Sequence, residues 1–306
     1  MSDSRGINPR IFALVRTILA FSTIFTIAGS RSAELFLVDL SSQNPVRCLE
    51  IQNKINLFCL MSRIEYAQIV AVFIGILVAS GYFARTVSLF HAWLSFSFFN
   101  SIGPLDGGDQ VNAIFTLLLV GVAFLYPKGN LWRLEIGSGI GKANRFIADA
   151  SILLIMFQCT VIYIDAGLGK LNSEVWHQGS AIWYWAQHPQ FGVSASAIDP
   201  VLGLLSYPLI SAFFTWGTIA LEVFIAIAIY SDSKDTKRIG LMAGIIFHSA
   251  IAVIIGLWSF SLTMIALLIF VFSVKRLEEE KEPHDDSSYC PCIPNRDGIL
   301  PVAGYK

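Results

Sequence analysis

A short stretch of the chain, residues 165–188, holds several side chains that can exchange protons, set among aromatic residues. Lys170 follows two glycines at the end of an apolar run, and a lysine withdrawn from water can lose its proton and act as a base. Such a mixture at the end of an apolar run is typical of an interfacial site where non-helical backbone lines a cavity. The candidate catalytic residues are Lys170 and His177, and the candidate cavity or substrate-binding residues in this stretch are Asp165, Glu174, Trp176 and Trp183.

Lys170 also has a plainer interpretation, as an anchor at the membrane surface. A lysine beside aromatic residues commonly lays its apolar stem along the protein and extends its ammonium group to the lipid head groups. Spacing alone favours this anchoring role over catalysis. An interfacial histidine such as His177 is likewise more often solvated than catalytic. Both roles of Lys170 therefore stay open on these residues alone.

Ionisable residues inside apolar segments form a second set of candidates, because charge at membrane depth is costly and usually marks a bundle interior or a wet cavity. Glu222 and His248 could form a buried pair that tunes the proton affinity of each member, or could join helices as satisfied polar groups. We count both as cavity residues. Arg16 is expected to form a structural ion pair with Asp149 or Glu222, since burying an unpaired guanidinium group is expensive.

Long apolar segments must position these residues. Of the 306 residues, 55% are hydrophobic and 14% are charged, and the mean hydropathy is +0.63, whereas soluble domains are about 25% charged. A helix that crosses the hydrocarbon core needs about 20 mostly apolar residues. The sequence predicts an all-α, polytopic membrane bundle of about eight transmembrane helices, near residues 11–28, 66–83, 87–102, 111–126, 146–167, 207–230, 240–257 and 259–274.

One transmembrane domain, residues 1–276, is expected to account for nearly the whole chain. Residues 277–306 begin with a run of charges and continue with Pro, Ser, Asp and Gly, so we expect a disordered cytoplasmic tail. Polar residues dilute the third span, and seven spans is the alternative to eight. Residues 201–205 could belong to the sixth helix through a kink at Pro208.

The distribution of Lys and Arg predicts the orientation, because these residues prefer cytoplasmic loops. With eight spans and the N-terminus inside, the inner segments hold fifteen of the 21 basic residues and the outer loops hold five, while Arg16 lies within a span. Residues 29–65 and 168–205 are then outside. We expect a multi-pass protein of the plasma membrane with both termini in the cytoplasm.

Asp109 and Gln110 follow two glycines at the start of the fourth span. The predicted topology places them on the same side of the membrane as Lys170, so they could share its cavity. Asp109 is equally suited to cap the N-terminus of a helix. We include both residues as cavity candidates and keep the capping role as the alternative for Asp109.

Four of the five cysteines lie outside the predicted spans. Cys48 and Cys59 share the outer loop, where an oxidising compartment would permit a disulfide, although spacing cannot establish its geometry. Cys290 and Cys292 form a lone C-x-C without a second pair of ligands, so we expect no metal site. The net charge of −1 gives no reason to expect a nucleic acid as a partner, whereas the composition makes the lipid bilayer one.

The fifth span ends in Tyr163-Ile-Asp-Ala-Gly-Leu-Gly-Lys170-Leu, and Val175-Trp-His-Gln-Gly-Ser-Ala-Ile-Trp183 follows it. This segment resembles the HTTM fold shared with vitamin K-dependent γ-glutamyl carboxylase, in which a lysine in an Ala-Gly-x-x-Lys-Leu context is the catalytic base. Lys170 occupies the matching position. Together with Gly107-Gly-Asp-Gln110 before the fourth span and Pro189-Gln-Phe-Gly192, the pattern looks like the SdpB family of bacterial membrane proteins.

The resemblance implies a role in the maturation or export of a secreted antimicrobial peptide. It also implies two partners, a secreted peptide precursor and a small partner protein of the same system. The carboxylase carries a large lumenal domain after its membrane part, which residues 277–306 do not match, so we do not expect glutamate carboxylation to carry over. The cofactor is unknown: a quinone or a lipid is possible, but no residue indicates either, and whether the chain is an enzyme stays open.

Two other functions are compatible with the same residues. A membrane transporter would use polar groups at breaks in the spans as a substrate path, although no inverted repeat is visible. A non-catalytic scaffold or immunity partner would need the bundle but not Lys170. The chemistry of Lys170 therefore separates these functions.

Overall fold

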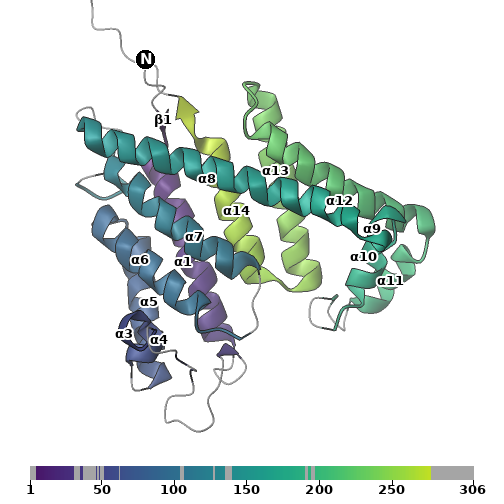
Figure 1. Ribbon diagram of the computed structural model, residues 1–306, viewed down its shortest axis with the longest axis horizontal. Helices are drawn as coiled ribbons and strands as arrows, with labels where there is room; N and C mark the ends of the chain where they lie inside the picture. The colour runs from purple at the N-terminus through teal and green to yellow at the C-terminus, as the bar shows by residue number, and fades with distance from the viewer. Residues whose placement is uncertain are drawn as a thin grey trace, which may run out of the picture.

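The computed structural model confirms the all-α membrane bundle predicted from the sequence (Figure 1). It describes residues 5–30, 35–36, 46, 48, 52–61, 63–103, 107–126, 128–134, 140–189, 192–193 and 197–276. The expected tail and its two cysteines lie outside these residues. Five helices are long and apolar enough to cross a membrane, and two shorter apolar helices accompany them.

Each of the eight apolar segments expected from the sequence contains a long helix. Two of these helices continue into a tighter or a wider turn, η1 (Ala123–Leu125) and the π-helix η3 (Ile251–Ile255). The long helices are α1 (Pro9–Gly29), α5 (Ile64–Ser80), α6 (Ala84–Phe99), α7 (Gly107–Val122), α8 (Lys142–Gly169), α12 (Pro208–Ala228), α13 (Lys234–Ala250) and α14 (Trp258–Ser273).

Shorter elements connect the long helices and form one end of the structure. The short helices are α3 (Gln52–Ile55), α4 (Leu57–Leu60), α9 (Glu174–His177), α10 (Ala181–Ala186) and α11 (Ile198–Leu205), with the 3₁₀ turn η2 (Lys170–Asn172) directly after α8. Helices α9, α10 and α11 gather at the far end of α8 and α12 (Figure 1). The segment around Lys170 is therefore helical but broken into short pieces.

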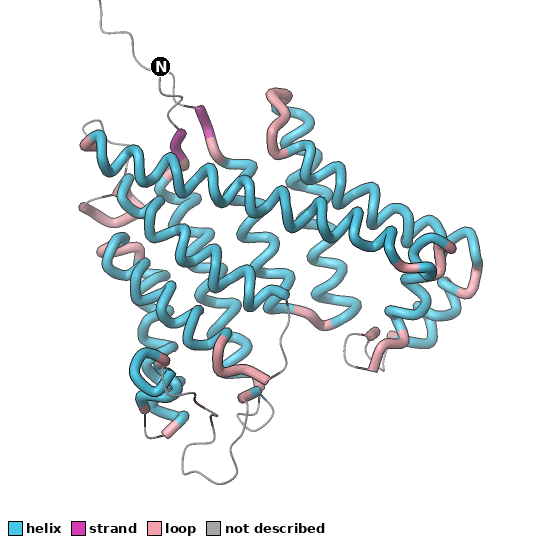
Figure 2. Tube along the Cα trace, in the orientation of Figure 1, coloured by secondary structure: helices cyan, strands magenta, loops and turns pink. Residues whose placement is uncertain are grey.

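Helix α1 lies inside the bundle, where it packs against α5, α14 and α7. Helix α8 runs along α7 and continues along α12, so that it joins the part around α1 to the pair α12 and α13 (Figures 1 and 2). Large apolar side chains on the outer helices stay exposed, among them Phe213 at 72% and Ile246 at 65%. In a bilayer such side chains face lipid, which is as apolar as they are.

Both ends of the described bundle lie together. Strand β1 (Arg5–Gly6) pairs antiparallel with β2 (Lys275–Arg276), and the backbone N–H of Arg5 donates to Asp149 at 2.9 Å. An even number of membrane crossings brings the two ends to the same side. The expected ion pair of Asp149 with Arg16 is wrong, because the guanidinium nitrogens of Arg16 have no hydrogen-bond partner among the described residues.

The segment before α12 is a separate helix and not a kinked extension of it. Helix α11 ends at Leu205, and α12 begins at Pro208 after a turn through Ser206 and Tyr207. Proline suits the first position of a helix because the N–H it lacks would have no partner there. The kinked extension through residues 201–205, left open from the sequence, is therefore excluded, and the span expected at 207–230 corresponds to α12.

Cys48 and Cys59 are joined by a disulfide, with their Cα atoms 6.0 Å apart. Close to Cys59, Asn56 caps α4 by accepting from Phe58 N–H at 2.9 Å and donates to the carbonyl of Ser97 at 3.0 Å. The disulfide therefore closes a loop that hydrogen bonds hold against the end of α6.

The topology can be tested with paired cysteine labels in a variant whose five native cysteines are replaced by serine. We expect Gln187→Cys, in the predicted outer segment, to react with an impermeant maleimide in intact cells. Asp232→Cys, between α12 and α13, should react only after the cells are opened. Labelling of Asp232→Cys in sealed cells at the rate of Gln187→Cys would contradict the predicted orientation.

The disulfide predicts how Cys48 and Cys59 react with alkylating reagents. In unreduced cells Cys48 and Cys59 should resist alkylation and should react together once a reductant is added, because neither carries a free thiol. A Cys48→Ser variant supplies the control, since it leaves Cys59 free to react without reductant. Rapid alkylation of both cysteines in the unreduced wild-type chain would exclude the bridge.

Candidate functional site

The site begins with a close approach between α8 and α12 at Gly167. A Cβ atom at this glycine would lie 3.1 Å from Val223 Cγ2 and 3.4 Å from Glu222 Cβ, with the carbonyl of Ile219 at 3.5 Å. Small residues allow membrane helices to approach closely in this way. The approach carries Glu222 to the last turn of α8, where Lys170 follows.

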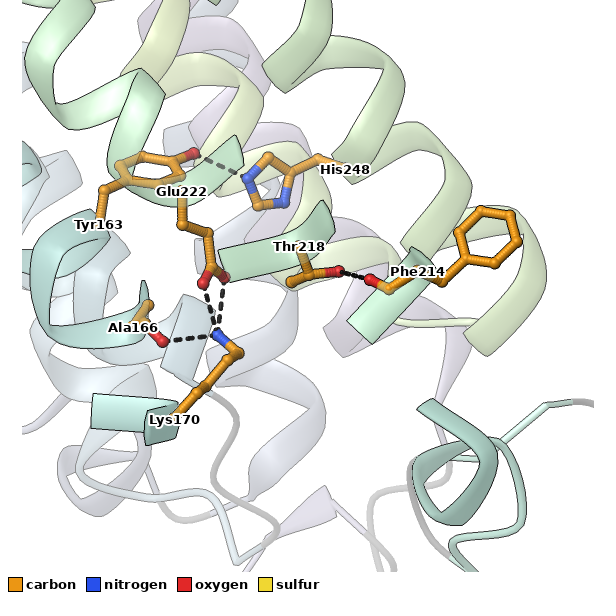
Figure 3. Close-up of polar contacts among 7 residues, drawn as sticks. All are labelled: Tyr163, Ala166, Lys170, Phe214, Thr218, Glu222 and His248. Atoms are coloured by element: carbon orange, nitrogen blue, oxygen red, sulfur yellow. Dashed lines mark hydrogen bonds and ion pairs between the residues drawn. The ribbon is translucent and has the colours of Figure 1, made fainter. Parts of the chain in front are cut away.

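The Lys170 ammonium group is held by Glu222 and by its own helix (Figure 3). Its Nζ atom lies 2.6 Å and 2.8 Å from the two carboxylate oxygens of Glu222 and donates to the carbonyl of Ala166 at 2.7 Å. It also lies 5.2 Å from the centre of the Trp176 ring. The Glu222 side chain is 8% exposed and the Lys170 side chain 21%. These contacts form a charge-assisted pair of which most is removed from water.

A second polar pair lies beside the first, between α8 and α13 (Figure 3). The hydroxyl oxygen of Tyr163 is 2.7 Å from His248 Nε2, and both residues are buried. Tyr163 precedes Lys170 by two helical turns, so the two side chains share a face of α8. Within the part of the chain that the structure describes, His248 Nδ1 has no hydrogen-bond partner.

The backbone after His248 is unusual. Helix α13 passes into the π-helix η3 at Ile251, and this wider turn ends at Gly256 in the left-handed region. The rings of Phe247 and Phe260 surround the imidazole, with ring centres 5.0 Å and 5.6 Å away. The pair of Tyr163 and His248 is therefore enclosed by aromatic side chains.

Comparison with known proteins identifies the family of the chain. The sequence profile of the HTTM domain matches residues 4–275. The sporulation-delaying protein SdpB of Bacillus subtilis (strain 168) is 30% identical over 270 residues, which cover 87% of this chain and 82% of that relative. The chain belongs to the SdpB family.

A second relative in the same organism, the uncharacterized protein YitO, is 26% identical over 275 residues, covering 87% of this chain and 86% of YitO. No solved structure matches the chain. As a member of the SdpB family with an HTTM domain and apolar helices of spanning length, the chain is a multi-pass membrane protein.

The structure brings together part of the site that the sequence of this SdpB-family chain predicted. Lys170, Glu222 and Trp176 are in contact, and His248 lies beside them through Tyr163. Two roles were open for Glu222 and His248, a buried pair with each other or polar groups that join helices. The structure shows the second, because Glu222 binds Lys170 and His248 binds Tyr163.

Other predicted site residues lie apart from the ammonium group of Lys170. Asp165, Glu174 and His177 are exposed, and Glu174 accepts a hydrogen bond from Gln178 at 2.8 Å. The His177 ring packs near Trp216, with ring centres 6.5 Å apart. Trp183 packs with residues of α10 and α11, including Ala186 and Leu205.

Asp109 and Gln110 also contribute no contact to the Lys170 ammonium group that the structure describes. Asp109 is buried at 6% exposure in the first turn of α7, where the positive end of the helix dipole stabilises a carboxylate. Gln110 is exposed. Because α7 begins at Gly107, Asp109 is not the N-cap. Gly107 lies against Phe260, the ring that also packs on His248.

Sequence reasoning missed Tyr163, Gly167 and the carbonyl of Ala166. The spacing of Tyr163, Gly167 and Lys170 was a usable signal, because residues four and seven apart lie on one face of a helix. The spacing does not predict which helices pack against that face. The described apolar pocket lies elsewhere, lined by residues of α7, α8 and α14 such as Ile114, Ile155 and Leu267.

The ion pair of Lys170 and Glu222 predicts that removal of one charge destabilises the fold more than removal of the other. Removing one partner of a buried ion pair costs about 3–5 kcal/mol of folding free energy. Lys170→Met should cost more than Glu222→Leu, because it strands the more deeply buried carboxylate, whereas the lysine can reach solvent. The double variant should recover most of the loss.

Thermal unfolding of the purified protein in detergent measures these differences in melting temperature. Lys54→Met, on the short helix α3, is the control for loss of a lysine outside the site. If the double variant is as unstable as the sum of the two single variants, the two side chains do not act as a pair.

Proposed function

We propose that this chain is the membrane component of a system that matures or exports a secreted antimicrobial peptide, and that Lys170 and Glu222 form its acid–base pair. The observation that carries the proposal is the contact of the Lys170 ammonium group with the Glu222 carboxylate at 2.6 Å, largely buried at the end of α8. The similarity to the sporulation-delaying protein SdpB supports the choice of system.

The location of the pair suits a peptide substrate. The distribution of basic residues predicts that the C-terminal end of α8 faces outward, the side on which an exported peptide emerges. Helices α9, α10 and α11 lie beside that end and present aromatic side chains, including the half-exposed Tyr184 and Trp185. Aromatic side chains at a membrane surface can bind both the backbone and the apolar side chains of a peptide.

The chemistry of the pair follows from its burial. Two charges in a site of low polarity lose hydration, so a substrate that excludes water favours the neutral forms of both groups. Transfer of one proton from Lys170 Nζ to a Glu222 carboxylate oxygen produces a neutral amine and a carboxylic acid. The amine can then accept a proton from the peptide, and the acid can donate one. This division is that of a general base and a general acid.

Replacement of Lys170 by arginine tests the proposal. Arginine can keep the ion pair with Glu222 but stays protonated in proteins, so it cannot serve as the base. We expect Lys170→Arg to express normally and to lose at least about 99% of mature peptide, since general base catalysis contributes about 10²–10⁴-fold to a rate. Lys54→Arg, at an exposed lysine of α3, should leave the yield unchanged.

The measurement is mass spectrometry of the peptide in cells and in medium, with the chain coexpressed with a peptide precursor encoded by a neighbouring reading frame. Amounts of the membrane protein must be equal in the compared cells, because loss of folding would imitate loss of chemistry. A Lys170→Arg variant that yields normal active peptide would leave a scaffold as the function. Mature peptide retained inside the cells would instead indicate a transporter.

A further inference from the structure

Arg16 is the most deeply buried charged side chain that the structure describes. It lies on α1 with 0% exposure. Its Nε, Nη1 and Nη2 atoms are all buried without a hydrogen-bond partner among the described residues. The ring of Phe12, whose centre lies 5.5 Å from the guanidinium carbon, is an aromatic neighbour and not an anion.

The carboxylates expected to neutralise Arg16 have other partners. Asp149 accepts the backbone N–H of Arg5, and Glu222 binds Lys170. The predicted ion pair of Arg16 is therefore wrong for both residues. An unpaired guanidinium group in a bundle interior lowers the folding stability by several kcal/mol, because no hydrogen bond or counter-charge in the protein replaces its lost hydration.

Helix α6 presents three buried polar side chains in the same part of the bundle. Ser88, His91 and Ser95 follow the spacing of one helical face and are each at most 2% exposed. The Oγ atoms of both serines and Nε2 of His91 lack hydrogen-bond partners in the described chain. Helix α6 contacts α1, and Arg16 and His91 each lie seven residues after the first residue of their helix. The unpartnered groups of α1 and α6 thus form one cluster.

This lack of partners is local and not general to the polar residues of these helices. Farther along α6, Ser97 accepts from Leu57 N–H at 3.1 Å. Farther along α1, Ser22 donates to the carbonyl of Ser259 at 3.0 Å, and Thr23 accepts from Asn112 at 3.0 Å. Asn112, His248 and Ser261 each leave one buried atom unpartnered on other helices, whereas α1 and α6 carry such atoms at Arg16, Arg85, Ser88, His91 and Ser95.

We propose that Arg16, Ser88, His91 and Ser95 form a buried binding site for a monovalent carboxylate. The guanidinium group offers a planar fork of N–H donors that matches a carboxylate, and the two hydroxyls and the imidazole can donate further hydrogen bonds. One guanidinium charge balances one carboxylate charge. A phosphate would bring up to two charges and leave the site over-compensated.

The site is distinct from the pair of Lys170 and Glu222. Arg16 and His91 each lie about 10 Å along their helices from the first residue, at 1.5 Å per residue. The predicted topology puts this depth in the inner half of the membrane, whereas Lys170 is at the outer end of α8. A carboxylate could come from a small free acid or from the head of a fatty acid in the bilayer.

Thermal unfolding in nanodiscs tests the site, with sodium acetate replacing sodium chloride at constant ionic strength and pH. We expect the melting temperature of the wild-type chain to rise and to saturate with acetate, because a ligand that binds the folded state stabilises it. Sodium octanoate in place of acetate distinguishes a fatty-acid head from a small acid by a lower midpoint. Sodium sulfate controls for ionic strength.

Variants assign the effect to the cluster. Arg16→Met should abolish the acetate response and raise the melting temperature without acetate, since it removes an unpaired buried charge. Ser88→Ala and Ser95→Ala should each raise the acetate midpoint about tenfold, the loss of one hydrogen bond to a charged group. Arg145→Met is the control, because Arg145 lies on α8, donates to the carbonyl of Arg5 at 3.4 Å and should leave the response intact.

The serine variants decide the question if Arg16→Met does not fold. A wild-type response that is equal in acetate, chloride and sulfate would overturn the proposal, as would an unchanged acetate midpoint in both serine variants. Lys170→Arg should keep the full acetate response. Failure of the peptide-maturation proposal and failure of this site are therefore measured separately.

Discussion

In the hydrocarbon core of a bilayer, an unpaired backbone group or charge finds no water to bind, so each must find its partner within the protein. Helices α1, α5–α8 and α12–α14 meet this constraint for the backbone by bonding within themselves. Side chains meet it in pairs: Lys170 binds Glu222, and Tyr163 binds His248. Where α8 ends near Lys170, a 3₁₀ turn and the short helix α9 continue the backbone hydrogen bonds.

The contact between α8 and α12 turns this constraint into a site. Gly167 removes the side chain that would hold the two helices apart, and the approach puts the carboxylate of Glu222 against the end of α8. Helix α13 packs on α12 and supplies His248 to the same face. Three helices from separate parts of the chain therefore contribute to a few adjacent side chains (Figure 3). Rigid helices hold such groups more accurately than loops do.

Two cationic groups of this SdpB-family protein, the partly buried Lys170 and the fully buried Arg16, meet the constraint in different ways. Lys170 has an internal counter-charge, so its protonation can change by transfer within the pair. Arg16 has none among the described residues and stays charged under all ordinary conditions. A permanent charge without an internal partner suits binding of an anion, whereas a shared proton suits acid–base chemistry. The bundle interior thus assigns different chemistry to lysine and to arginine.

The sequence by itself determined the class of fold and the approximate place of every long helix. Apolar length and low charge leave few alternatives in a membrane, because backbone hydrogen bonds must close within each segment. It also singled out Lys170, Glu222 and His248, since ionisable residues in apolar segments are rare enough to be conspicuous.

Only the tertiary structure decided which of these residues meet. The sequence left open whether Glu222 and His248 pair with each other or join helices, and the structure shows that they join helices. The expected pairing of Arg16 with Asp149 or Glu222 is wrong. Periodicity places a residue on a face of its own helix, but it contains no information on which helix packs against that face or at what height. The close approach at Gly167 determines that α12 packs against this face of α8 and at what height. The partners of Lys170 and the isolation of Arg16 therefore follow from helix packing, which depends on side-chain shape along whole helices.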